Sequence, residues 1–233
     1  MPFYITGGGD QSCYHAMDKD FMENIPNNSK ILAIPLAVDP DEYDEVMERA
    51  EECFNNKKVS EIILCSDPAE LEESDIEDYA AIFIEGGNTF QLVKTVRQSP
   101  IFNLLENFLE NDGIIYADSA GAIILGSSVK TAFLGETPDE DHERIQDLRG
   151  LGLIDNWSIH CHFELEESDD INDLLYEEGY PIICLPETTA VKIMDNDLTV
   201  FGTGDVDIFT FTTHKSVAAG TSICLEQILN KTG

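Results

Sequence analysis

The chain has 233 residues, of which 46 are acidic and 13 basic, so its formal net charge at pH 7 is −33. This charge argues against nucleic acids and anionic membrane surfaces as partners, because both would be repelled. The length suits a single domain that spans residues 1–233 and has one substantial core.

The six cysteines are scattered without a CxxC spacing, and several lie inside apolar runs. This placement is typical of buried free thiols in a reducing compartment. The chain opens without a signal-peptide pattern, and no apolar run approaches the length of a membrane span. We therefore expect a cytoplasmic protein without a membrane partner, and a homodimer stays open as its oligomeric state.

Strand-like and helix-like segments alternate through the first half of the chain. Apolar runs typical of buried strands occupy residues 3–6, 30–38, 59–65, 80–84 and 113–118. Helical periodicity is found over residues 39–54, 91–98, 101–111 and 122–125. This alternation predicts an α/β fold with a doubly wound, mostly parallel sheet covered on both faces.

The second half of the chain becomes richer in β-structure. Residues 133–150 are charged and contain many turn formers, which predicts a surface loop. A strand, a helix and another strand are expected at 157–163, 170–178 and 181–185. Short apolar segments at 190–194, 198–201, 206–211 and 215–219 predict C-terminal β-hairpins at the sheet edge, with a short helix at 225–229.

The segment GIIYADSAGAIILG, residues 113–126, carries the clearest chemical signal. A strand ends abruptly at Asp118-Ser119-Ala120-Gly121, and a helix follows at once. A serine on such a tight turn has its hydroxyl lifted clear of the sheet, as in the hydrolase pattern G-x-S-x-G. Ala117 stands where the first glycine of that pattern belongs. A turn of small residues that serves only packing is the alternative.

Two glycine turns also follow strands, at Gly7-Gly8-Gly9 and at Gly86-Gly87. The amides of the second turn are placed to stabilise an oxyanion, with Asn88 or Thr89 as the cap of the next helix. Neither turn continues into a phosphate-binding motif, so we do not expect nucleotide binding.

Two histidines lie close together in the segment SIHCHFE. An extended strand would place His160, His162 and Glu164 on one face. Taken alone, these residues leave three interpretations open. In the first, His162 is the general base for Ser119. In the second, the three residues bind a metal ion. In the third, the histidines are structural.

Four segments occur in an order that resembles a known family. They are IEGGNTFQL at 84–92, DSAGA at 118–122, GLGLI at 150–154 and His162-Phe163. In this order they resemble the family of serine peptidases that contains aspartyl dipeptidase (peptidase E) and cyanophycinase. The resemblance runs from the first strand to Glu187.

The resemblance implies a class I glutamine amidotransferase-like fold in which a serine replaces the amidotransferase cysteine. It implies that Ser119 is the nucleophile and His162 its base. It also implies an oxyanion hole made by the N–H groups of Gly87 and Ala120, with Gly86 as a close neighbour.

The third member of the triad departs from the family pattern. In the family it is an acid in the loop after the helix of the serine, but an ungapped match reaches Leu134. Glu136, Asp139, Glu140 and Asp141 are near enough to substitute. Glu136 is the nearest, and we predict that it orients His162.

The substrate pocket departs as well, because the family's arginines after the histidine are absent between residues 164 and 187. We expect a small-peptide exopeptidase that needs no metal or organic cofactor and prefers neutral or basic N-terminal residues to aspartate. Acid selectivity would return if Lys94, Arg97 or Lys130 folded into the pocket. A metal-dependent hydrolase and a non-catalytic binding member of the fold are the alternative functions.

Overall fold

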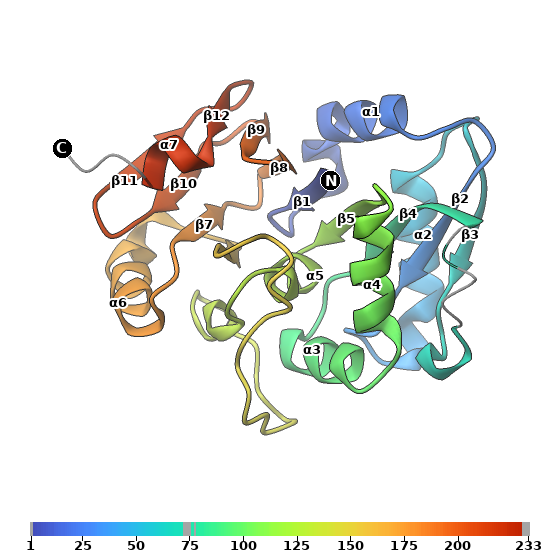
Figure 1. The fold of residues 1–233 in the computed structure, drawn as a ribbon, viewed down its shortest axis with the longest axis horizontal. Coiled ribbons are helices and arrows are strands. Elements are labelled where there is room, and N and C mark those ends of the chain that lie inside the picture. The colour runs from blue at the N-terminus through green and yellow to red at the C-terminus, as the bar shows by residue number, and fades with distance from the viewer. Residues whose placement is uncertain (1, 72–75, 77, 230–233) are drawn as a thin grey trace.

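The computed structural model describes residues 2–71, 76 and 78–229 (Figure 1). Its larger sheet has eight strands: β1 (Pro2–Thr6), β2 (Ser29–Ile34), β3 (Val59–Leu64), β4 (Tyr79–Ile84), β5 (Ile114–Asp118), β8 (Thr189–Met194), β9 (Asp197–Gly202) and β12 (Ser222–Cys224). Their order is β12-β9-β8-β1-β5-β4-β2-β3. The five strands from β1 to β3 in this order run parallel, and β8, β9 and β12 extend the edge in antiparallel fashion.

Helices cover both faces of the parallel part, which confirms the doubly wound α/β prediction. The helices are α1 (His15–Asn24), α2 (Tyr43–Cys53), α3 (Thr89–Arg97), α4 (Ile101–Glu110), α5 (Ala120–Leu125), α6 (Ser168–Glu178) and α7 (Leu225–Leu229). Short 3-10 turns occupy Gln11–Cys13, Pro40–Glu42, Pro68–Glu70, Lys130–Phe133 and Leu165–Glu167. Because strand side chains alternate, Tyr4 packs with α1 and α2 on one face, whereas Phe3 and Ile5 pack with α3 to α5 on the other.

Helix α1 was not among the elements expected from the sequence. Three of its side chains are buried, and two of them, Met17 and Phe21, are spaced by four residues and are fully buried; the third is Met22. The Phe21 ring lies 5.3 Å from the Tyr4 ring and 5.5 Å from the Tyr116 ring, both edge-on. Burying a Phe side chain contributes about 1.5–3 kcal/mol, so tertiary packing stabilises a helix whose mean hydropathy is low.

The C-terminal hairpins divide between two sheets, which corrects the expectation that they all extend one edge. A second sheet has the order β11-β10-β7-β6 and is built from β6 (Ser158–Cys161), β7 (Ile182–Leu185), β10 (Val206–Phe209) and β11 (His214–Val217). Ile183 and Ile208 on one face join the main core, and Ile182 and Phe209 on the other pack against α6. The second sheet thus lies between the larger sheet and α6.

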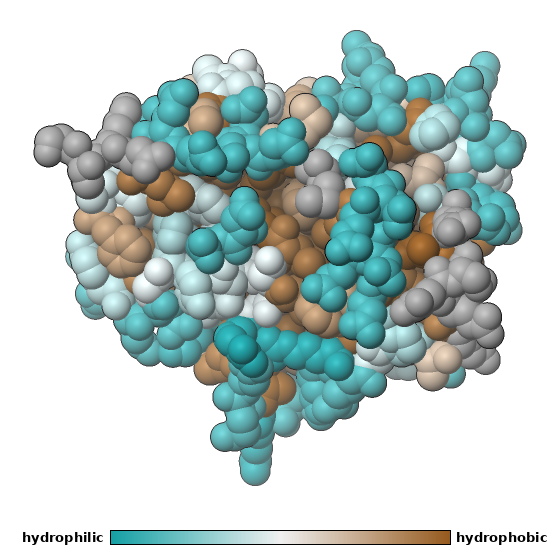
Figure 2. Space-filling model, in the orientation of Figure 1, coloured by the Kyte–Doolittle hydropathy of each residue, from teal (hydrophilic) through white to brown (hydrophobic). Residues whose placement is uncertain are grey.

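Residues 134–157 contain no helix or strand, and part of this loop projects at the bottom of the view (Figure 1). The projecting part is hydrophilic, like most of the face shown in Figure 2. Asn88 caps α3 by accepting the Gln91 amide (2.9 Å), and its side-chain amide donates to the Glu140 carbonyl (3.0 Å). The loop is therefore attached to the start of α3. None of the helices in the described ranges combines the length and the apolar character of a membrane span.

Candidate active site

Ser119 lies on the turn between β5 and α5. Its φ of 45° and ψ of −111° are strained for a residue with a side chain. Glycines on neighbouring elements make room for this turn. A Cβ on Gly121 would lie 2.4 Å from the Ile84 carbonyl oxygen, and a Cβ on Gly86 or Gly8 would lie 3.2 or 3.0 Å from that of Ser119. The turn is the sharp strand-to-helix geometry that exposes a nucleophilic hydroxyl.

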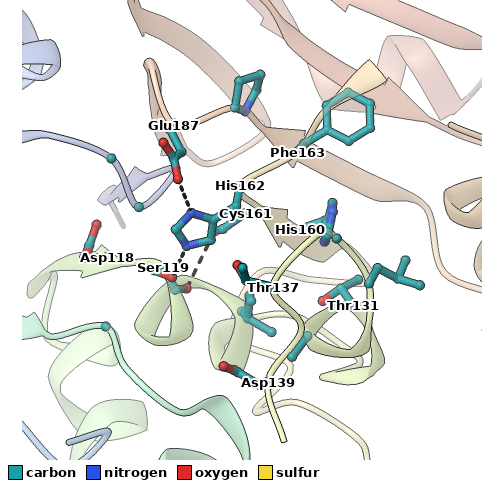
Figure 3. A pocket seen from close by; sticks show the side chains of 18 of the residues that line it. Asp118, Ser119, Thr131, Thr137, Asp139, His160, Cys161, His162, Phe163 and Glu187 are labelled. Atoms are coloured by element: carbon teal, nitrogen blue, oxygen red, sulfur yellow. Dashed lines mark hydrogen bonds and ion pairs between the residues drawn. The ribbon is translucent and has the colours of Figure 1, made fainter. Parts of the chain in front are cut away.

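A chain of two hydrogen bonds joins Ser119 to an imidazole and a carboxylate (Figure 3). Oγ of Ser119 lies 2.7 Å from Nε2 of His162, and Nδ1 of His162 lies 2.9 Å from Oε1 of Glu187. A carboxylate at Nδ1 favours the tautomer that carries its proton there. Nε2 is then free to accept the serine proton, which is the arrangement that activates a serine.

Glu187 reaches His162 because of the way β6 and β7 pair. The two strands are parallel and Cys161 is paired with Leu185, so the residues that follow both strands lie at the same sheet edge. The buried Tyr14 hydroxyl donates to the Glu187 carbonyl oxygen at 2.6 Å and fixes the backbone there. A sequence signal could have identified Glu187, because it is an acid that comes shortly after β7, the strand that follows the histidine strand β6.

The structure places Glu187, and not Glu136, at Nδ1 of His162, which corrects the expected acid partner. Glu136 is exposed on the loop that lines another part of the cavity. The ungapped match followed the chain, whereas the carboxylate comes from a turn that is adjacent only in space. The other three candidates bind elsewhere: Asp139 accepts from the Thr89 amide (2.9 Å), Glu140 lies 3.5 Å from His142, and Asp141 accepts from the Ile145 amide (3.1 Å).

The expected one-face arrangement of His160, His162 and Glu164 does not form. Strand β6 ends at Cys161, and His162 has a φ of 57°, which breaks the alternation. His160 is buried, and its Nε2 lies 2.7 Å from Oε2 of Glu167. In the part of the chain that the structure describes, no three His, Cys, Asp or Glu side chains are grouped to hold a metal ion.

The predicted oxyanion residues lie around the same turn. Gly86 and Gly87 line the cavity together with Ser119. Gly87 has a φ of 130°, and a Cβ there would lie 2.5 Å from the Ala37 carbonyl oxygen, so only glycine suits this position. Ala120 is the first residue of α5, and its N–H therefore has no acceptor within the helix.

The cavity around Ser119 has a volume of about 790 Å³ and is strongly acidic. Arg49 is the one Lys or Arg among the described residues that line it. Lys94, Arg97 and Lys130 are instead paired with Glu143, Asp147 and Glu177–Glu178, and none of the three lines the cavity. Seven acids line it: Glu85, Asp118, Glu136, Asp139, Glu164, Glu167 and Glu187.

Two of these acids have pKa values raised by their surroundings. Burial, reinforced by the nearby Asp118 carboxylate, raises the pKa of Glu85 to about 7, although Arg49 and the Gly86 amide oppose the shift. Burial also raises the pKa of Asp118, against the opposing hydrogen bond from the Thr6 hydroxyl. The wall beside the serine therefore disfavours the ionised forms of both carboxyls, and Arg49 offsets this only in part.

Comparisons with known proteins identify the family of the chain. The profile of Peptidase family S51 matches residues 3–201. Peptidase E of Nostoc sp. (strain PCC 7120 / SAG 25.82 / UTEX 2576) is 24% identical over 220 residues, which cover 88% of this chain and 86% of that protein.

Two solved structures have the same fold. A peptidase from an acI-B1 Actinobacterium is 20% identical, with a TM-score of 0.74 and coverage of 96% of each chain. A candidate peptidase E from Listeria monocytogenes EGD-e is 16% identical, with a TM-score of 0.66 and coverage of 86% of this chain and 98% of its own.

The raised pKa of Glu85 predicts that the free energy of unfolding decreases as the pH rises. Between the ordinary value of 4.5 and about 7, the folded state binds a proton that the unfolded chain has released, so stability is lost as the pH rises. Glu85→Gln removes this loss. From pH 5 to pH 8, the free energy of unfolding of the variant should rise relative to wild type by roughly 2 kcal/mol, measured by urea unfolding.

Glu164→Gln is the matched control, because it removes an exposed carboxylate from the same cavity. Its free energy of unfolding should follow the wild-type pH dependence. If Glu85→Gln differs from wild type by the same amount at both pH values, the account of Glu85 is wrong.

Proposed function

The chain belongs to peptidase family S51 and is a serine peptidase, and we propose that it is a small-peptide exopeptidase that works through an acyl-enzyme on Ser119. The observation that carries this proposal is the hydrogen-bonded chain from Ser119 through His162 to Glu187. A cavity of about 790 Å³ is also of the size that encloses a small ligand.

In the proposed mechanism, Oγ of Ser119 attacks the carbonyl carbon of the scissile peptide while Nε2 of His162 takes the hydroxyl proton. The tetrahedral intermediate collapses when Nε2 returns this proton to the leaving amine, and an ester with Ser119 remains. Water then attacks the ester with Nε2 again as the base, and the carboxylic acid product leaves. Glu187 stays ionised throughout and stabilises the imidazolium through Nδ1–H.

The negative oxygen of the tetrahedral intermediate needs donors that are already in place. We assign this role to the N–H groups of Gly87 and Ala120, and to Gly86 the role of keeping space beside Ser119. The closeness of Gly86 to Ser119 supports this assignment. Preformed donors stabilise the developing charge without reorganisation during the reaction.

We also propose a cytoplasmic location. All six cysteines are free thiols, and Cys65, Cys161 and Cys184 are buried. Burial raises the pKa of the Cys161 thiol well above its usual range, which makes this group unreactive. Free thiols of this kind are typical of proteins in a reducing compartment.

The nucleophile is tested by Ser119→Ala. Turnover of small peptides should fall by roughly 10⁴- to 10⁶-fold, because the loss of one triad member removes most of the catalytic power. Labelling of wild type by a fluorophosphonate probe, followed by mass spectrometry, should locate the adduct on Ser119 and find none in the variant. Equal peptidase activity in a folded Ser119→Ala protein would falsify the proposal.

The acid partner is tested by comparing Glu187→Gln with Glu136→Gln. Glutamine at 187 keeps the shape but removes the charge that stabilises the imidazolium, so kcat should fall by roughly 10²- to 10⁴-fold. Glu136→Gln removes the same charge from the cavity loop and should change kcat only slightly. Steady-state kinetics on one dipeptide decide between the two acids, and the reverse ranking would restore Glu136 as the partner.

The charge of the cavity bears on substrate choice. A substrate carboxylate buried without a cation would cost several kcal/mol. Arg49, the one lysine or arginine that the described part of the chain contributes to the lining, is already paired with Glu85, with Nε and Oε1 3.1 Å apart. We therefore propose that this peptidase disfavours N-terminal aspartate.

Three dipeptides with the same leaving residue test this preference. The kcat/KM for Asp-Leu should be lower than for Ala-Leu and Lys-Leu by at least about tenfold, since one unfavourable charge of about 1.4 kcal/mol gives that factor. A clear preference for Asp-Leu would mean that Arg49 leaves Glu85 to bind the substrate.

A further inference from the structure

Two carboxylates stand side by side in the cavity wall, at the ends of neighbouring parallel strands. Strands β4 and β5 pair in a register that sets Phe83 opposite Tyr116 and Ile84 opposite Ala117. Glu85 and Asp118 are the next positions along the two strands. Since side chains alternate along a strand, both carboxylates leave the sheet on the face of Phe83 and Tyr116.

The Asp118 carboxylate lies next to the nucleophile. The Thr6 hydroxyl donates to its Oδ1. Its Oδ2 is on the side of Gly86, where a Cβ would lie 2.9 Å from this oxygen and 3.2 Å from Cβ of Ser119. One glycine therefore touches both the carboxylate and the serine, and Figure 3 shows Asp118 and Ser119 together at this end of the cavity.

Glu85 is only 4% exposed, and its two oxygens differ. Oε1 accepts from Nε of Arg49 at 3.1 Å, whereas Oε2 has no hydrogen-bond partner among the described residues. Arg49 is about half exposed, and among the described residues that line the cavity it is the one lysine or arginine beside these two acids. A buried carboxylate oxygen without a hydrogen-bond partner is costly. The Glu85–Asp118 pair can therefore accept one more positively charged donor.

We propose that Asp118 and Glu85 form the subsite for the α-ammonium group of the N-terminal residue of the substrate. The proposal rests on Ser119 being the nucleophile of a peptidase. It restricts hydrolysis to the first peptide bond of chains with a free amino terminus.

The position of the two acids favours the α-ammonium over a cationic side chain. In an N-terminal residue, the α-nitrogen is separated from the attacked carbonyl carbon by a single carbon atom. Its anionic partner must therefore lie beside the nucleophile, as Asp118 does. The ammonium of a lysine side chain is several bonds further from that carbon, so its anionic partner need not lie beside the nucleophile.

The test compares Ala-Leu with propionyl-Leu, which is the same molecule without the amino group, and with N-acetyl-Ala-Leu. Wild type should hydrolyse propionyl-Leu and N-acetyl-Ala-Leu with kcat/KM values about 10- to 100-fold below that of Ala-Leu. This is the usual effect of losing a hydrogen bond to a charged group. In Glu85→Gln and Asp118→Asn, the ratio of Ala-Leu to propionyl-Leu should fall toward one. In Glu164→Gln, an equal change of charge in the same cavity, the ratio should stay as in wild type.

Binding gives a readout that does not depend on turnover. Calorimetric titration of the Ser119→Ala protein should show that Ala-Leu binds at least about tenfold more tightly than propionyl-Leu. Equal affinity, or a wild-type ratio in both acid variants, overturns the subsite. If no fluorophosphonate adduct forms on Ser119 but Ala-Leu still binds more tightly, the peptidase mechanism fails and the ammonium site stands.

Discussion

The close approach of several backbones around Ser119 is the constraint on which the rest of the structure depends. A strained φ/ψ pair of this kind costs about 1–3 kcal/mol and persists only where the surroundings enforce it. Here they do so through α5, which is buried on all sides and packs against β5, β6 and α3. The glycines at 8, 86 and 121 let β1, β4 and β5 converge on one serine. A Cβ at Gly8 would overlap the His162 imidazole, and a Cβ at Gly121 would overlap the Ile84 carbonyl, so both positions require glycine.

Elements with a strong local pattern were predictable, and those defined by distant partners were not. The strand expected at 80–84 is β4, Tyr79–Ile84, because its apolar run is continuous. The strands at 206–209 and 214–217 were expected at the edge of the main sheet, but β10 pairs with β7 and β11 pairs with β10 in the second sheet. Nothing within a short strand specifies which edge it joins, since pairing depends on packing against the whole core.

The same distinction holds within the site. Ser119 and His162 belong to short motifs, and the structure brings both together. Glu187 was missed because its position depends on the parallel pairing of β6 with β7 and on Tyr14, which comes from the other end of the chain. His162 has a positive φ, and its backbone N–H donates to the Gly7 carbonyl oxygen at 3.0 Å, a partner that is also distant in the sequence.

The positions of the few lysines and arginines show where the acidic composition affects function. Lys94 and Arg97 tie the 134–150 loop to α3, and Lys130 ties the start of that loop to α6. These cations pair with acids outside the cavity lining, in partly exposed ion pairs that solvent screens. The acids that line the cavity have Arg49 as the one lysine or arginine beside them among the described lining residues. A substrate that brings positive charge therefore adds a counter-ion to a lining that has few cations, whereas one that brings negative charge adds repulsion.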